Sequence, residues 1–167
     1  MKRWLAKTAL LAAIAFPALS RAAWADGCSN ATLNGEYAFG ITAYTPPSLQ
    51  NGLPPPQTEV VAGIKVFDGQ GTLTQRDYQG DNLTGPDFAP PGQETGTYTV
   101  DSDCTGSMEI NLNVPGMGGV IDIKFVISNG GRHIHEVVSQ FTPPGASGPV
   151  PTQTSGDDWK VASAQDQ

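Results

Sequence analysis

Residues 120–141 read VIDIKFVISNGGRHIHEVVSQF, and this stretch decides the fold class. In its first half, Ile and Phe alternate with Asp and Lys, which is the period-two pattern of a half-buried strand. Asn129-Gly130 then gives the clearest hairpin signal in the chain, because both residues tolerate the positive φ of a tight turn. The second half continues as another strand, so the stretch predicts an antiparallel hairpin.

Similar short runs, separated by Gly, Pro, Asn and Asp, follow one another along the chain. They predict strands at residues 36–44, 59–67, 72–78, 95–101, 107–113, 120–128, 132–141 and 158–163. Three Pro-rich segments are expected to be loops, because Pro has no amide hydrogen to donate to a sheet; they span residues 45–57, 80–93 and 142–155. No amphipathic helical period follows residue 25.

The predicted fold class is all-β, a single antiparallel meander of about eight strands. A closed barrel is favoured over a two-sheet β-sandwich, because closure leaves no exposed strand edge. A barrel of this size has an interior that side chains can fill or that can hold one small ligand. An outer-membrane barrel fits less well, since the strands are mostly short and aromatic residues are few.

Composition sets further bounds. The 167 residues are 38% hydrophobic and only 15% charged, with 20 Gly and 14 Pro, which excludes a long coiled coil. The length predicts one β-barrel domain, residues 26–167, after the N-terminal segment.

Residues 1–25 have the features of a secretory signal peptide. A basic start precedes the apolar stretch Ala9 to Leu19, and Ala23-Trp24-Ala25 predicts cleavage before Asp26. Ala18-Leu19-Ser20 is a weaker candidate for the cleavage site. A different alternative is that the N-terminal segment stays on the protein as an uncleaved anchor, or that the protein carries a lipid anchor. We therefore expect an exported protein, in the periplasm or outside the cell.

Cleavage would change the charge of the protein. It removes four of the nine basic residues and none of the sixteen acidic ones, so the net charge goes from −7 to −11. A surface this acidic argues against nucleic acid or an anionic membrane as a partner. We expect no membrane insertion of the mature chain, and the sequence does not indicate an oligomeric state.

Cys28 and Cys104 are the two cysteines of the chain. In an oxidising compartment the simplest prediction is one disulfide, worth roughly 4–5 kcal/mol because it closes a long loop. The alternative is a pair of buried free thiols.

Several local patterns together resemble a group of small, largely uncharacterised exported bacterial β-proteins. The residues that carry the resemblance are Cys28 with 32–39 (TLNGEYAF), 67–74 (FDGQGTLT), 96–100 (GTYTV), 103–106 (DCTG) and 132–134 (RHI). Such proteins look like calycin or allene-oxide-cyclase-like barrels. The resemblance implies a closed antiparallel barrel, with room for an apolar cavity, and implies no activity. No catalytic residue of a cyclase can be matched to this chain.

His133-Ile134-His135 is the sharpest candidate for chemistry. Residues i and i+2 of a strand face the same side, so the two imidazoles could bind a metal with Asp122 of the neighbouring strand as a third ligand. Glu136 should face the opposite side. The alternative is a solvated or hydrogen-bonded histidine pair. No nucleophile motif or phosphate loop is present, and no organic cofactor is expected.

The apolar strand faces are the other candidate site. The side chains expected to face the interior are Tyr37, Phe39, Ile41, Phe125, Ile127, Val137, Phe141 and Trp159. They either fill a core or partly line a cavity for a small apolar ligand. The residues predicted to line such a cavity are Tyr37, Phe39, Phe125, Phe141 and Trp159.

These observations lead to three functional hypotheses. The first is a non-enzymatic barrel that binds a small apolar ligand or a protein. The second is a cyclase- or isomerase-like enzyme acting on a lipid-derived substrate. The third is a metal-binding protein that uses the two histidines.

Overall fold

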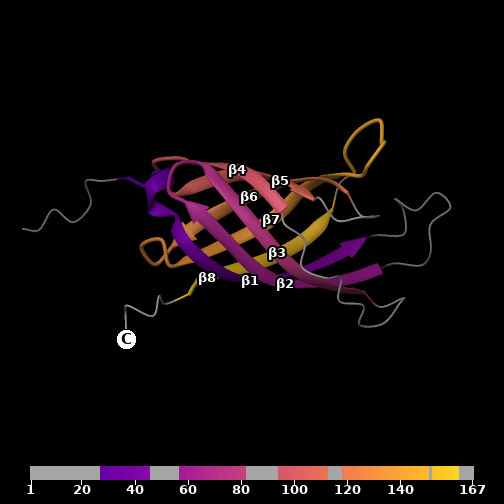
Figure 1. Ribbon diagram of the computed structural model, residues 1–167, viewed down its shortest axis with the longest axis horizontal. Helices are drawn as coiled ribbons and strands as arrows, with labels where there is room; N and C mark the ends of the chain where they lie inside the picture. The colour runs from indigo at the N-terminus through magenta and orange to yellow at the C-terminus, as the bar shows by residue number, and fades with distance from the viewer. Residues whose placement is uncertain (1–26, 46–56, 82–93, 113–117, 151, 162–167) are drawn as a thin grey trace, which may run out of the picture.

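A computed structural model describes residues 27–45, 57–81, 94–112, 118–150 and 152–161. Eight antiparallel strands form a meander that closes into a barrel, as predicted (Figure 1). The elements are the 3₁₀ helix η1 (Asn30–Thr32) and the strands β1 (Asn34–Thr45), β2 (Gln57–Asp68), β3 (Thr72–Asp81), β4 (Glu94–Val100), β5 (Thr105–Leu112), β6 (Gly119–Ser128), β7 (His133–Thr142) and β8 (Gln153–Lys160). The predicted signal peptide at 1–25 and most of the predicted loops at 45–57 and 80–93 lie outside the described residues.

Each strand pairs with the next, and β1 also pairs with β8, which closes the barrel. At the β6–β7 connection, Asn129 and Gly130 have φ values of 53° and 64°, the left-handed conformation expected for this turn. Within the described residues, no helix has the length and apolarity needed to cross a membrane.

Alternate residues of the strands point into the barrel and form its core. Phe67 lies between two other aromatic rings, with centroids 5.2 Å from Tyr37 and 5.1 Å from Tyr98, both in edge-to-face contact. Full burial of a large apolar side chain contributes roughly 1.5–3 kcal/mol, so this layer is a main source of stability. It lies in the half of the barrel nearer to η1, together with Leu33, which is fully buried.

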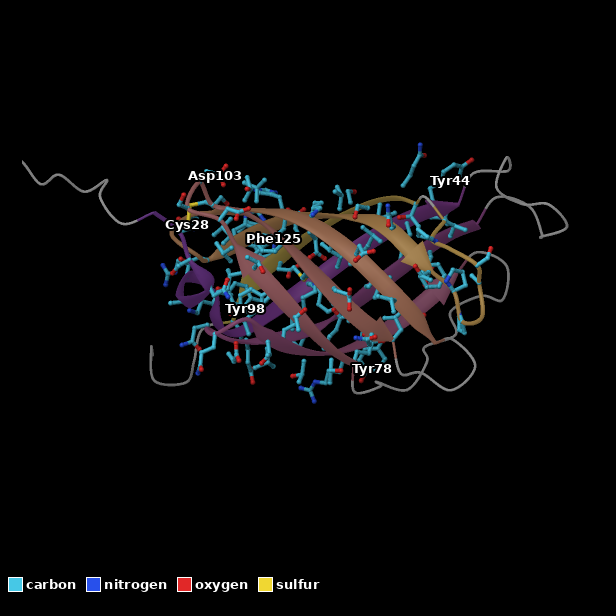
Figure 2. The ribbon with its side chains drawn as sticks, turned by 90° about the horizontal axis from the view of Figure 1, so that it is seen from above. Cys28, Tyr44, Tyr78, Tyr98, Asp103 and Phe125 are labelled. Atoms are coloured by element: carbon cyan, nitrogen blue, oxygen red, sulfur yellow. A yellow bond between two sulfur atoms is a disulfide. The ribbon has the colours of Figure 1, made fainter. Side chains whose placement is uncertain are left out.

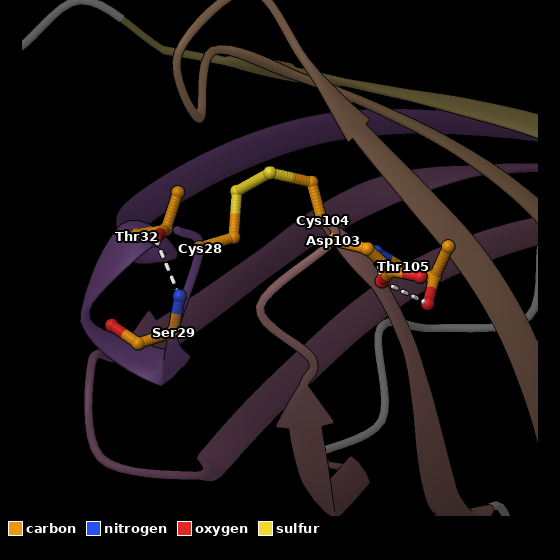
Figure 3. The surroundings of a disulfide bond; sticks show 6 residues. All are labelled: Cys28, Ser29, Thr32, Asp103, Cys104 and Thr105. Carbon is orange, nitrogen blue, oxygen red and sulfur yellow. Dashed lines mark hydrogen bonds between the residues drawn. A yellow bond between two sulfur atoms is a disulfide. The ribbon is translucent and has the colours of Figure 1, made fainter. Parts of the chain in front are cut away.

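The N-terminal segment closes that end of the barrel. The Tyr98 hydroxyl donates to the carbonyl oxygens of Asn30 and Leu33, at 3.1 and 3.0 Å, and the Asn30 side chain accepts from the Val100 amide at 2.8 Å. Figure 2 shows Cys28 at this end, and Figure 3 shows its disulfide with Cys104. The Cα atoms of the two cysteines are 4.9 Å apart, and the predicted pairing is confirmed.

The last strand differs from its prediction. It begins at Gln153 and ends at Lys160, whereas the sequence pattern placed it at 158–163. Its alternation is also out of phase with the prediction, because Asp158 is fully buried while Trp159 is 56% exposed. The predicted loop at 142–155 overlaps both strands, since β7 runs to Thr142 and β8 begins at Gln153.

Candidate functional site

Two adjacent strands place the histidines beside a carboxylate on the outer face of the barrel. His133 and His135 share one face of β7, as predicted. In the antiparallel pairing with β8, Asp157 lies opposite His135 and Trp159 lies opposite His133. The four side chains, which we call the histidine cluster, therefore form a two-by-two block. Across β8, the neighbouring positions on β1 are Ala38 and Gly40, which are too small to cover it.

Both imidazoles contact the same oxygen of the carboxylate. Asp157 Oδ1 lies 3.0 Å from His133 Nε2 and 2.7 Å from His135 Nδ1. The three atoms all lie within 4.8 Å of one another. The side chains of His135 and Asp157 are more than half exposed, whereas that of His133 is only 11% exposed. One face of the site is therefore fixed by packing and the other is open to solvent.

Trp159 is the reason that His133 is covered. Its ring stacks on the imidazole with centroids 3.6 Å apart and an interplanar angle of 13°. Stacking of this kind holds the imidazole in one orientation. The expectation that Trp159 lines the interior is thus wrong: the ring lies outside, because the inward position next to it is taken by Asp158. Val137 also faces outward, at 46% exposure, because the inward positions of β7 are Glu136 and Val138.

Asp122 is not the third member of the cluster. On β6 the residue opposite His135 is Val126, and Asp122 lies four residues further along that strand, opposite Gln140. At about 3.3 Å per residue, this places Asp122 about 13 Å away along the strand. The carboxylate comes from β8 instead. Glu136 points away from the histidines, as expected, and is buried in the interior.

The cluster carries the donor atoms of a transition-metal site. Two imidazole nitrogens and one carboxylate oxygen are ligands that Zn²⁺ accepts at about 2.0–2.2 Å. In a tetrahedral site such ligand atoms are about 3.3 Å apart, so the two imidazole–carboxylate contacts of 2.7 and 3.0 Å would widen by a few tenths of an ångström, and the imidazole nitrogens already lie within 4.8 Å of each other. A shallow open groove on the outer face of β5 to β8 reaches the cluster and is lined by Ser107, Lys124, Val126, His135, Val137 and Asp157.

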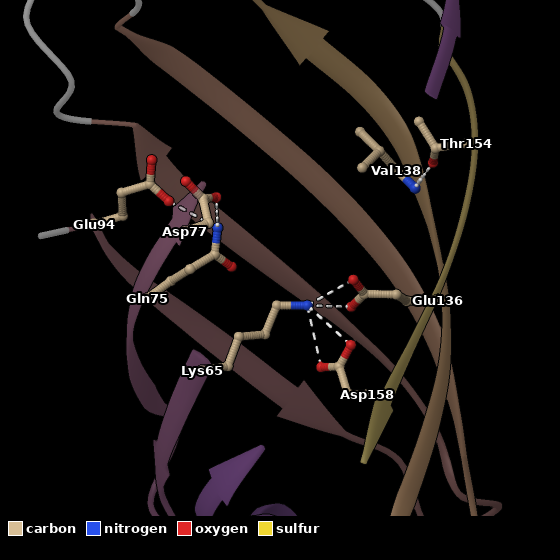
Figure 4. Close-up of polar contacts among 8 residues, drawn as sticks. All are labelled: Lys65, Gln75, Asp77, Glu94, Glu136, Val138, Thr154 and Asp158. Atoms are coloured by element: carbon tan, nitrogen blue, oxygen red, sulfur yellow. Dashed lines mark hydrogen bonds and ion pairs between the residues drawn. The ribbon is translucent and has the colours of Figure 1, made fainter. Parts of the chain in front are cut away.

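The barrel interior holds a second polar group of side chains, around a buried lysine. Lys65 Nζ lies 2.6 Å from both carboxylate oxygens of Glu136 and 3.1–3.3 Å from those of Asp158 (Figure 4). All three side chains are almost completely buried. The ammonium also lies over the Phe39 ring, 4.4 Å from its centroid. This lysine is the only buried cation among the described residues, apart from any charge on His133.

Burial and charge act against each other in this group. Burial alone would lower the pKa of Lys65, but the carboxylates of Glu136 and Asp158 outweigh it and raise that pKa. Burial raises the pKa of Asp158 to about 7, although the ammonium of Lys65 opposes the shift. The lysine is therefore held charged, whereas Asp158 can take up a proton near neutral pH.

A third polar group lies beside it on β3 and β4. Gln75 Nε2 donates to Asp77 Oδ2 at 3.0 Å and to Glu94 Oε2 at 2.7 Å (Figure 4). All three residues are at most 5% exposed. Burial, and then the charge of Asp77, raise the pKa of Glu94 to about 7. Burial likewise raises the pKa of Asp77, against the opposing effects of Gln75 and Lys65.

Of the aromatic residues expected to line a cavity, three are buried inside the barrel. Tyr37, Phe39 and Phe125 are at most 5% exposed, and Phe141 is partly buried. Tyr37 also donates a hydrogen bond to the Gly131 carbonyl, and burial raises its pKa to about 12. The buried charges were missed at the sequence level. The strand alternation does contain a signal for them: Lys65 lies on the same strand face as the apolar Phe67, and Glu136 lies on the same face as Ile134.

Comparisons with protein-family models, with curated proteins and with solved structures returned no match. Function must therefore be argued from the geometry of these sites.

Proposed function

We propose that this protein binds a divalent transition-metal ion at the histidine cluster, with His133, His135 and Asp157 as its ligands. One observation carries the proposal: two imidazole nitrogens from one strand converge on a single carboxylate oxygen from the next. Three protein ligands leave at least one coordination position for water or for a molecule in the adjoining groove. Zn²⁺ and Cu²⁺ suit these donors, whereas Ca²⁺ prefers oxygen ligands alone.

The physical case rests on preorganisation. Strand register places all three donors, and the stacking of Trp159 orients His133, so little ordering remains for the metal to impose. The ion would displace the protons that the imidazoles share with Asp157. Metal and protons compete for the same nitrogen lone pairs, so affinity should fall in acid.

The test is calorimetric titration of the untagged, disulfide-bonded protein with Zn²⁺, Cu²⁺ and Ca²⁺. We expect one equivalent of Zn²⁺ or Cu²⁺ to bind, and Ca²⁺ to bind at least about tenfold more weakly. Asp157→Asn should weaken zinc binding by more than about tenfold, since even the groups that orient metal ligands are worth that much.

Asp122→Asn is the matched control, because it makes the same substitution on the same outer surface away from the cluster. Its zinc affinity should equal that of the wild type. Equal losses in the two variants would point to non-specific binding by the acidic surface. If neither Zn²⁺ nor Cu²⁺ bound to the wild type, the proposal would be refuted outright.

We further propose that the protein works outside the cytoplasm, in the periplasm or extracellular space, after cleavage of residues 1–25. The Cys28–Cys104 disulfide supports an oxidising compartment. The closed eight-stranded meander is in keeping with the calycin-like resemblance. N-terminal sequencing of protein recovered from the cell envelope should begin at Asp26, and an intact Met1 would contradict the proposal.

The other two hypotheses have less support. The aromatic side chains that would hold an apolar ligand, such as Tyr37 and Phe125, pack within the core of the described barrel. A cyclase or isomerase acting on a lipid would need an apolar chamber, whereas the described middle of the interior contains Lys65 and several carboxyl groups. The metal-binding hypothesis is favoured because its ligands are brought together and two of them, His135 and Asp157, are exposed to solvent.

A further inference from the structure

The described part of the barrel interior contains two pairs of carboxyl groups, and the pairs differ in their partners. Glu136 and Asp158 share the ammonium of Lys65, which lies 2.6–3.3 Å from their oxygens. Asp77 and Glu94 share only the neutral amide of Gln75. With every carboxyl ionised, one lysine would face four negative charges. The charge of Lys65 lowers the pKa of Asp77 without a hydrogen bond to it, so the second pair has no hydrogen-bonded cation among the described residues.

The second pair also leaves hydrogen-bonding capacity unused. Gln75 Oε1 and Glu94 Oε1 are buried atoms that have no hydrogen-bond partner among the described residues. An unsatisfied buried acceptor destabilises the folded protein, and natural proteins contain few of them. Two such acceptors, on residues that lie opposite each other on β3 and β4, indicate a place that lacks a hydrogen-bond donor.

Reorienting the glutamine does not remove this deficit. Both amide hydrogens of Gln75 are used, one toward Asp77 and one toward Glu94. Exchanging the amide oxygen and nitrogen would point the oxygen at Asp77 Oδ2 and Glu94 Oε2, and a single proton on the carboxyl pair would satisfy only one of those two contacts. The carboxyl pair therefore fixes the amide, and the unpartnered oxygen remains an acceptor.

The register of β3 and β4 brings these side chains together. Gln75 lies opposite Glu94 in the described part of the β3–β4 pairing. Asp77 follows two residues later on β3, on the same face of the strand, where β3 also pairs with β2. The amide of Gln75 therefore lies between the two carboxyl groups.

We propose that Gln75, Asp77 and Glu94 form a binding site for the alkylammonium group of a small molecule. The ammonium would donate to the free oxygens of Gln75 and Glu94 and neutralise the pair, as Lys65 does for Glu136 and Asp158. An ammonium supplies three donors and a positive charge, which are the two things the pair lacks. The raised pKa of Glu94 agrees with this, because a carboxyl without a cation holds its proton.

The test uses n-butylamine as the probe and 1-butanol as its neutral counterpart, at pH 7, followed by ¹³C NMR of the side-chain carboxyl groups. We expect the amine, and not the alcohol, to shift the Glu94 resonance with a Kd of about 1 mM or tighter. Saturation with amine should also lower the pKa of Glu94, so binding should release protons near pH 6.5. Calorimetry in buffers of different ionisation enthalpy measures this release.

Glu94→Gln should weaken amine binding by at least about tenfold, a loss that matches one charged hydrogen bond. Glu109→Gln is the matched control, since Glu109 is exposed on the outer face of β5. Circular dichroism checks that both variants fold. Asp157→Asn should leave amine binding unchanged, which separates this site from the histidine cluster.

Three results would overturn the proposal. No shift of the Glu94 resonance at amine concentrations up to about 100 mM would exclude a usable site. Equal affinity in the Glu94 and Glu109 variants would place binding elsewhere. A response to Ca²⁺ without a response to the amine would assign the site to a hard metal ion instead.

Discussion

Replacing Lys65 with methionine would test how the barrel tolerates charge in its interior. The substitution keeps a long apolar stem and removes the ammonium, which has four carboxylate oxygens within 3.3 Å. Glu136 and Asp158 would then face each other, buried and without a cation. The structure therefore predicts a large loss of stability that depends strongly on pH.

The magnitude follows from the burial of the partners. Removing one member of a buried ion pair costs about 3–5 kcal/mol, because the remaining charge is left without compensation. We expect this loss in the free energy of unfolding at pH 7.5. At pH 5 the loss should shrink to about 1–2 kcal/mol, because Asp158, whose pKa is already about 7, binds a proton and can donate to Glu136.

Urea denaturation, followed by far-UV circular dichroism at constant ionic strength, measures both values in the disulfide-bonded protein. Lys124→Met serves as the control, because Lys124 is exposed on the outer face of β6 and should change stability by less than about 0.5 kcal/mol. If Lys65→Met cost the same at pH 5 and pH 7.5, the ion-pair explanation would fail and lost packing would replace it.

Two further predictions concern stability. The folded protein raises the pKa of Glu94 to about 7, well above the ordinary value of about 4.3, so it binds that proton more tightly than the unfolded chain does. The free energy of unfolding should thus fall as the pH rises from about 4.5 to 7, and Glu94→Gln should flatten this slope in a series of urea titrations. The cysteines of the Cys28–Cys104 bridge are 76 residues apart, so its reduction should lower the free energy of unfolding by roughly 4–5 kcal/mol. A shift of the urea midpoint equivalent to less than about 1 kcal/mol would argue against the loop-entropy explanation.

The strands were predictable from the sequence because their signal is local. Alternation and turn residues identified β1 to β7 within a few positions, and Asn129-Gly130 marked the β6–β7 turn. β8 was predicted less well, because its pattern contains a single large apolar residue. Hydrophobicity alone predicts that Trp159 faces inward, whereas the residue that faces inward is Asp158.

The sites depend on strand register, which a single sequence does not contain. The histidine pair follows from spacing within one strand, but Asp157 joins it only through the β7–β8 pairing. In the same way, Lys65 meets Glu136 from a strand 71 residues away in sequence. A buried charge is energetically acceptable only with its partner, so the alternation that places Lys65 and Glu136 on inward faces is not enough, without the strand register, to identify them as buried.

The pairing of β1 with β8 has a consequence for how the chain reaches its native state. Its partners, such as Tyr37 and Lys160, lie at opposite ends of the folded sequence, so the barrel cannot close until the final strand is available. Until then β1 and β7 each present an unpaired edge that can recruit another chain. Contacts of such high sequence separation also slow folding. A protein shortened before Gln153 should therefore aggregate rather than fold into a smaller sheet.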